Sequence, residues 1–123
     1  MAWLFKSDRP IYTQLLEQIQ LYIVSGIYPP GDKLPSVRDL ASEASVNPNT
    51  MQKALSELER SGLIYSQRTT GRYVTEDINM IKEVKENLAV EKITEFFLQM
   101  KELGFQPQET IELVQKSIKE LQQ

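Results

Sequence analysis

The chain contains no cysteine and no histidine among its 123 residues. Without cysteine there are no disulfides, no thiolate metal sites and no thiol nucleophile, and this composition is typical of a reducing compartment. Without histidine the commonest general base and the commonest metal ligand are both missing. The chain also lacks a glycine-rich phosphate loop. The sequence therefore favours no enzyme, no metal site and no cofactor.

Long apolar runs are missing as well. The apolar run in the opening MAWLFKSDRP is too short for a signal peptide. No later apolar stretch is long enough to cross a bilayer. Hydrophobic residues nevertheless make up 41% of the chain, enough for a core and too many for general disorder. We expect a cytoplasmic protein with one ordinary domain, or a small domain with an appendage.

Charge is distributed unevenly along the chain. The net charge is −3, which at first argues against a nucleic-acid partner. However, residues 1–75 hold eight Lys/Arg and seven Asp/Glu, whereas residues 76–123 hold six and ten. The acidic surplus therefore lies in the second part. Because net charge governs association and not fold, the local distribution decides which part could meet a polyanion.

Three helices are predicted in the first part. Residues 10–25 place apolar side chains on one helical stripe, and YPPGDKLP (28–35) is a turn-rich connector that cannot continue a helix. Ser36 then caps a short helix, and a tight turn leads to a third helix from Pro48 to about Arg60. Asn47 and Pro48 are residues that favour a helix start.

The second half begins with strand-favouring residues and then returns to helix. LIYSQ (63–67) and GRYVT (71–75) predict a β-hairpin, and residues 76–104 predict one helix or a broken pair, followed by a further apolar helix after Pro107. The expected fold class is mainly α with a small β-hairpin. We expect a winged helix-turn-helix domain at 1–75 and a helical region at 76–123.

The helix from Pro48 has an outer face suited to a DNA groove. At about 100° per residue its apolar residues share one sector, and the opposite side carries polar and basic residues near the helix start, with the acids further along. A recognition helix reads base edges with its N-terminal residues, where acids would be repelled by phosphates. Asparagine and glutamine can bind adenine, and lysine can bind guanine. The outer side carries Asn49, Lys53, Ser56 and Arg60, flanked by Thr50 and Gln52.

A simpler interpretation stays open for each of these features. Any surface helix has a polar outer face, and the residues at its start are good caps without a ligand. Arg38, just inside the helix capped by Ser36, suits a phosphate, but equally a solvated ion pair. Arg68 and Arg72 flank the hairpin turn as a pair that could follow the DNA backbone, although basic hairpin tips also serve solubility.

At this point residues 10–74 resemble a known family. YPPGDKLPSVRDLA, the VNPNT start of the third helix, KALSELERSGLI and a closing GRYV are similar to the winged helix-turn-helix domain of the GntR family of bacterial transcription regulators. The compact helical tail is similar to the YtrA-like subfamily. The resemblance implies an operator-binding homodimer, usually a repressor, with DNA contacts from Ser36, Arg38, Asn47, Asn49, Thr50, Gln52, Lys53, Arg68, Gly71 and Arg72.

The chain departs from the family pattern at two places. Many members have an arginine where this chain has Pro48, so its operator should differ from theirs. The wing commonly reads Gly-x-Gly-x-Phe-Val, but here the first glycine is Thr69 and the aromatic residue is Tyr73. This second departure concerns the path of the wing.

The helical tail is too apolar to remain in water, and the first part is too small to cover it. Large exposed apolar patches mark interfaces. We expect a homodimer that buries Ile93, Phe96, Phe97, Met100, Ile111, Val114, Ile118 and Leu121. The alternative is that these residues complete an intramolecular core. The tail is too short for a separate ligand domain and could at most contribute a crevice at the dimer interface, near Phe96, Phe97 and Phe105, for an unknown small-molecule effector. Aromatic residues at helical spacing are more often core.

Two classes of function follow. The leading hypothesis is a dimeric, sequence-specific DNA-binding transcriptional regulator. Its affinity for DNA should fall steeply with salt concentration, because several contacts are made to phosphates. The alternative is a winged-helix protein-interaction module that docks a partner through the apolar tail, whose binding should respond little to salt.

Overall fold

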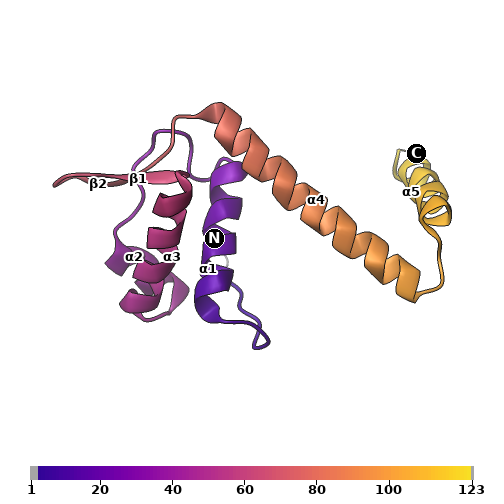
Figure 1. Cartoon of the computed structure of the whole chain (residues 1–123), viewed down its shortest axis with the longest axis horizontal. Coiled ribbons are helices and arrows are strands. Elements are labelled where there is room, and N and C mark those ends of the chain that lie inside the picture. Colours follow the sequence, from indigo (N-terminus) through magenta and orange to yellow (C-terminus); the bar gives the residue numbers. More distant parts are fainter. Residues whose placement is uncertain (1–2, 123) are drawn as a thin grey trace. The chain divides into compact units, whose positions relative to one another are not determined.

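Five α-helices and one two-stranded antiparallel sheet make up residues 3–122, the part that the computed structural model describes (Figure 1). In chain order the elements are α1 (Ile11–Val24), α2 (Val37–Ala44), α3 (Pro48–Ser61), β1 (Ile64–Gln67), β2 (Gly71–Val74), α4 (Ile78–Glu102) and α5 (Pro107–Leu121). The predicted fold class, mainly α with a small hairpin, is confirmed. Two compact units share the chain, one ending at Lys85 and the other beginning at Glu86.

Side-chain caps and a glycine set the ends of the helices around the turn between α2 and α3. The Ser36 hydroxyl oxygen accepts a hydrogen bond from the Asp39 amide at 3.1 Å, and the Asn47 side-chain oxygen accepts one from the Asn49 amide at 2.8 Å. Both bonds satisfy amides that a helix start leaves free. Gly62 ends α3 in the left-handed conformation at φ 88°, which costs glycine little. The predicted caps are therefore present.

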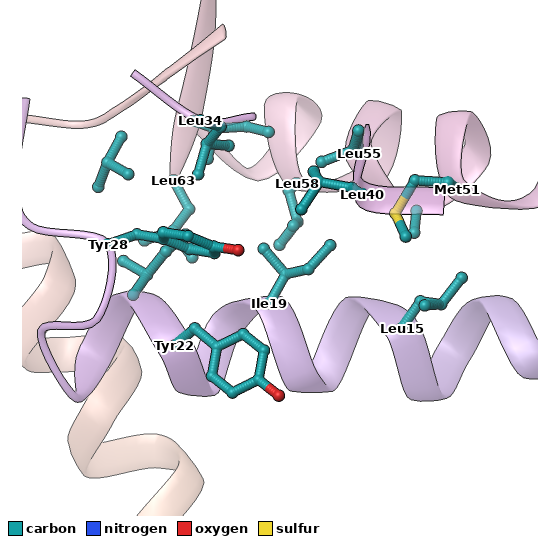
Figure 2. Packing of buried hydrophobic residues seen from close by; sticks show 14 of the residues in the cluster. Leu15, Ile19, Tyr22, Tyr28, Leu34, Leu40, Met51, Leu55, Leu58 and Leu63 are labelled. Atoms are coloured by element: carbon teal, nitrogen blue, oxygen red, sulfur yellow. The ribbon is translucent and has the colours of Figure 1, made fainter. Parts of the chain in front are cut away.

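The core of the first unit is built around α3, which packs against α1, α2 and β1. Figure 2 shows Met51, Leu55 and Leu58 of α3 facing Leu15 and Ile19 of α1, and each of these side chains is at most 1% exposed. Burying a side chain of this size contributes about 1.5–3 kcal/mol. The rest of the core includes Leu34, Leu40, Ala41, Leu63, Ile64 and Val74. The apolar sector predicted for the third helix is thus the buried one.

The β-hairpin is attached to the connector that precedes α2. β1 and β2 pair in the register that sets Ile64 opposite Val74. The amide of Leu34 donates to the carbonyl of Arg72, and the amide of Val74 donates to the carbonyl of Asp32, both at 2.9 Å. These bonds join the connector to the edge of β2 that does not pair with β1. The base of the wing is therefore fixed from two sides.

The turn of the hairpin includes Thr69 at a position where the family resemblance leads us to expect glycine. The amide of Thr70 donates to the carbonyl of Gln67 at 3.2 Å and closes the turn. Thr69 has φ 69°, in the left-handed region that β-branched residues rarely adopt. The wing therefore keeps its hairpin despite the departure, with backbone strain at this residue.

The segment before α1 is tied to that helix by two glutamines. The Gln14 side-chain amide donates to the carbonyls of Lys6 at 2.7 Å and Arg9 at 2.9 Å, and its oxygen accepts from the Lys6 amide at 2.6 Å. Gln18 donates to the carbonyl of Leu4 at 2.6 Å. Because Gln14 is only 3% exposed, these bonds satisfy a buried polar group. The sequence did not predict this segment's position.

α4 is one continuous helix of 25 residues, and not the broken pair that residues 76–104 also allowed. Ile81 is buried in the core of the first unit, and Val84 packs against that core. By its contacts the first compact unit includes this first part of α4, as far as Lys85. None of the helices within residues 3–122 is both long enough and apolar enough to cross a membrane.

The second unit leaves most of its apolar side chains in solvent. The residues predicted to form a dimer interface are exposed or half-buried in the single chain: Ile93, Phe96, Phe97, Met100, Ile111, Val114, Ile118 and Leu121. An apolar hollow of about 300 Å³ lies where α4 meets the start of α5, and its lining includes Phe97 and Phe105 but not Phe96. Residues 86–122, taken by themselves, therefore do not close a core around these side chains.

Thr69 gives a first test, of the wing. We expect Thr69→Gly to raise the free energy of unfolding by about 0.5–1 kcal/mol, because the relief of left-handed strain exceeds the entropy lost with glycine. Thr70→Gly removes the same side chain from a residue without a positive φ and should lower stability by a similar amount. Urea denaturation followed by circular dichroism measures both. A Thr69→Gly protein no more stable than Thr70→Gly would contradict the strain argument.

Candidate nucleic-acid interface

The outer face of α3 is polar, and its first turn has no carboxylate. Asn49, Gln52 and Lys53 are exposed, and Thr50 is half-buried. The acids Glu57 and Glu59 lie in the later turns of the helix. A negatively charged ligand would therefore meet amide groups and an ammonium at the start of α3, and carboxylates only toward its end.

The two capping side chains keep hydrogen-bond donors for a ligand. Asn47 uses its oxygen in the cap of α3, so its NH₂ group remains a donor. Ser36 likewise accepts a bond in the cap of α2 and retains its hydroxyl proton. Arg38, in the first turn of α2, is exposed, and it forms no ion pair with any residue between 3 and 122. Asp39 in the same turn offsets part of its positive charge.

A hollow of about 840 Å³ lies between the start of α2 and the wing. Of the residues predicted to contact DNA, it is lined by Ser36, Gly71 and Arg72. Lys33 also lines it, and its side chain lies so close to Gly71 that a Cβ there would come within 3.0 Å of Lys33 Cε. The structure does not bring the other predicted residues into this hollow; these are Arg38, Asn47, Asn49, Thr50, Gln52, Lys53 and Arg68.

Arg72 is bound by the end of α3 and is not the exposed partner of Arg68 that the sequence suggested. Its Nε donates to Oε1 of Glu59, and the hydroxyl of Ser66 donates to the same oxygen at 2.6 Å. The side chains of Arg72 and Glu59 are 20% and 30% exposed. Arg68 at the turn is exposed, as expected. Arg72 therefore braces β2 against α3, and its guanidinium, which also lines the hollow, has further N–H donors.

The same contacts keep Glu59 ionised. The hydrogen bond from Ser66 is the largest influence, and it lowers the pKa of the Glu59 carboxyl. Burial opposes this and raises the pKa, but the hydrogen bond and the charge of Arg72 lower it further, so the pKa lies below its ordinary value. The ionised Glu59 of α3 thus links this helix to the hairpin. Sequence reasoning saw only an acid in a late turn, since no local pattern pairs it with residues of the hairpin.

Lys53 lies over an aromatic ring of α1. Its Nζ is 3.8 Å from the centroid of the Tyr12 ring, a cation–π distance. Tyr12 was missed by sequence reasoning, which assigned α1 only its buried stripe. No signal in the sequence alone links these two residues, because they belong to different helices.

The brace predicts a dependence of stability on pH. Because the pKa of Glu59 is lower in the folded protein than its ordinary 4.5, the unfolded chain takes up the proton first as pH falls. The stabilisation is therefore present above the ordinary pKa and is lost as pH falls through the folded-state pKa. We expect Glu59→Gln to cost about 1 kcal/mol at pH 7, a value reduced by solvent exposure, and less in acid.

Glu57→Gln is the matched control for this experiment. Glu57 pairs with Arg60 at 3.2 Å on the exposed surface of the same helix, where an ion pair contributes little. Urea denaturation of both variants at neutral and acidic pH makes the comparison. Equal, pH-independent losses in the two variants would show that the Glu59 contacts do not stabilise the wing.

Known proteins with this arrangement are bacterial regulators. Residues 11–74 match the family model described as "Bacterial regulatory proteins, gntR family". The chain is 43% identical to the HTH-type transcriptional regulator YhcF of Bacillus subtilis (strain 168) over 108 residues, which cover 88% of this chain and 89% of YhcF. It is 43% identical over 95 residues to the HTH-type transcriptional repressor YtrA of the same organism, covering 70% of this chain and 73% of YtrA.

Solved structures agree with this assignment. A GntR family transcriptional regulator from Listeria monocytogenes matches with a TM-score of 0.83 and 41% identity, over 91% of this chain and 98% of that one. The DNA-binding domain of AraR, in complex with operator ORX1, matches with a TM-score of 0.55 and 31% identity, over 58% of this chain and 93% of that one. The resemblance seen in the sequence is confirmed, and the chain belongs to the gntR family of bacterial transcriptional regulators, whose helix-turn-helix domain binds DNA.

Proposed function

We propose that this regulator binds a palindromic operator as a homodimer in the cytoplasm and represses transcription. The observation that carries the proposal is the start of α3, where exposed amides and Lys53 stand on a face whose first turn has no carboxylate. This is the charge order that a helix needs when its N-terminal end enters the major groove. The repressor part is supported by YtrA, which is named a repressor.

The proposed contacts divide into three groups by chemistry. Asn49, Gln52 and Lys53 of α3 would read base edges, since side-chain amides and ammonium groups match adenine and guanine. Cap and first-turn donors would hold phosphates; these are Ser36, Arg38, Asn47 and Thr50. The wing would follow the backbone through Arg68, Gly71 and the free N–H groups of Arg72. The DNA-binding domain of AraR has a similar fold and was solved in complex with an operator, which supports the proposal that this domain binds a duplex.

The homodimer is supported by the apolar surface of the second unit. Ile93 is 53% exposed, Ile118 is 48% exposed and Leu121 is 85% exposed, which is costly unless another surface covers them. A second copy would join two recognition helices, so half-sites should be spaced by one helical turn of about 10 bp or a multiple. The chain's hollow at the start of α5 has no residue that singles out a ligand, so we assign no effector.

The base-reading role predicts a loss of affinity in two variants. Lys53→Ala and Gln52→Ala should each weaken binding by about fivefold or more, since a good base contact contributes about 1–3 kcal/mol of discrimination. Lys82→Ala, which removes a lysine from exposed α4, is the control and should bind like the wild type. Fluorescence anisotropy with a duplex selected by the wild-type protein measures this. Wild-type affinity in both α3 variants would refute the assignment of the reading helix.

The dimer predicts a change of mass in solution. Phe96→Glu places a charge on the apolar side of α4 and should yield a monomer, because a buried unpaired carboxylate is strongly disfavoured. Gln99→Glu adds the same group at a polar, exposed position of the same helix and should leave the dimer intact. Sedimentation equilibrium at micromolar concentration measures both. A wild-type chain that sediments as a monomer would end the dimer proposal.

The apolar surface also favours a second candidate function, a module that docks a protein partner through α4 and α5. The two functions differ in their response to salt. Binding through several phosphates weakens steeply and log-linearly with salt concentration, whereas apolar docking changes little.

A further inference from the structure

We propose that Tyr12 is a positioning residue that holds the Lys53 ammonium at the place where it meets DNA. This inference rests on the proposed function, in which Lys53 contacts the duplex. The Lys53 Nζ lies 3.8 Å from the Tyr12 ring centroid. α1 would then take part in DNA recognition through its first turn, in addition to supporting α3 from behind.

Tyr12 belongs to a part of α1 that is anchored in the core through its neighbouring residues. Tyr12 is half-buried, and two residues close behind it in α1, Gln14 and Leu15, are 3% and 0% exposed. Lys53 stands between Met51 and Ala54 of α3, both of which are 0% exposed. Because α1 and α3 pack directly on each other, the backbones that carry Tyr12 and Lys53 are fixed relative to one another. The ring then limits the positions that the lysine side chain can take.

The chemistry of this contact suits a group that must bind an anion afterwards. An aromatic ring attracts an ammonium through its quadrupole without cancelling the positive charge. The ammonium keeps N–H donors on the side away from the ring. Three arginines of the same unit are instead paired with carboxylates: Arg9 with Glu17 at 2.7 Å, Arg60 with Glu57 at 3.2 Å, and Arg72 with Glu59. Lys53 is therefore restrained by the ring and forms no ion pair with a carboxylate of residues 3–122.

Restraint before binding should improve affinity. A free lysine side chain loses much rotamer freedom when it is fixed in a complex, and a group that is already ordered loses less. The ring also limits the positions along α3 that the ammonium can reach. Tyr12 should thus increase affinity through Lys53 without touching the DNA itself.

A double-mutant cycle tests this on the full chain, with a duplex selected from a random library by the wild-type protein. We expect Tyr12→Leu to weaken binding about two- to fivefold, the range of one exposed cation–π contact. Lys53→Met should weaken it at least as much. The double variant should bind like Lys53→Met alone, because the effect of the ring passes through the lysine. Tyr12→Phe keeps the ring and should stay close to the wild type.

Several results would overturn the inference. If Tyr12→Leu weakens binding equally in the Lys53→Met background, the tyrosine acts on the DNA or on the fold, and not through the lysine. Failure of Tyr12→Phe to restore affinity would assign the effect to the hydroxyl. Tighter binding by Tyr12→Leu would mean that the ring holds Lys53 away from the duplex.

The proposed function can fail separately from this inference. If the wild type retains no duplex, or if Lys53→Met binds like the wild type, the assignment of Lys53 is wrong and the role of Tyr12 is overturned with it. If Lys53→Met weakens binding but Tyr12→Leu does not, only the positioning role is wrong.

The contact can also be measured without DNA. In the wild type and in Tyr12→Phe, the Lys53 ε-methylene protons should resonate upfield of the other lysines, because they lie over a ring. The shift should vanish in Tyr12→Leu, with circular dichroism confirming that this variant is folded. Lys53 ε-protons at the ordinary lysine position in the wild type would overturn the inference.

Discussion

The burial of one face of α3 against α1 is the contact on which the rest of the site depends. Met51, Leu55 and Leu58 are at most 1% exposed, so the helix has only one rotation about its axis that keeps them out of water. That rotation turns Asn49 and Lys53 outward. Turning the helix far enough to hide the polar residues would expose side chains whose burial contributes about 1.5–3 kcal/mol each. The chemistry of the outer face is therefore set by the packing of the inner one.

Electrostatics in the first unit depends on which cations are paired, because the sum of charges there is close to zero. Arg9, Arg60 and Arg72 lie within 4 Å of carboxylates of the same unit, so their fields are partly cancelled. Lys53 and Arg38 are exposed and form no ion pair within the described residues. The exposed pairs of Arg9 and Arg60 add little stability. Arg38 and Lys53 leave unpaired positive charge near the starts of α2 and α3, where helix amides add to it.

Features encoded in neighbouring residues could be predicted from the sequence, and features that join distant residues could not. Caps act over two or three residues and helical periodicity over one or two turns, so the elements and the outward face of α3 followed from the residues alone. The brace from Arg72 to Glu59 spans 13 positions, and the contact of Lys53 with Tyr12 joins two helices. Both depend on how whole elements pack. The packing of Val84 on the core of the first unit likewise depends on tertiary contacts that no local pattern encodes.

In the proposed mechanism, DNA binding by the first unit depends on electrostatics and dimerisation through the second unit depends on apolar burial. Each of the two therefore supplies what the other lacks. One copy offers few phosphate contacts, and each of them weakens with salt because bound counterions must be released. Apolar contact between second units does not release counterions, so it would keep two reading helices together at salt concentrations where either alone would dissociate. Joined in this way, the second helix binds at a high effective concentration. The acidic surplus of residues 76–123 also has a place in this scheme, because a surface that repels phosphates would leave the reading helices of the first unit as the favoured contact with the duplex.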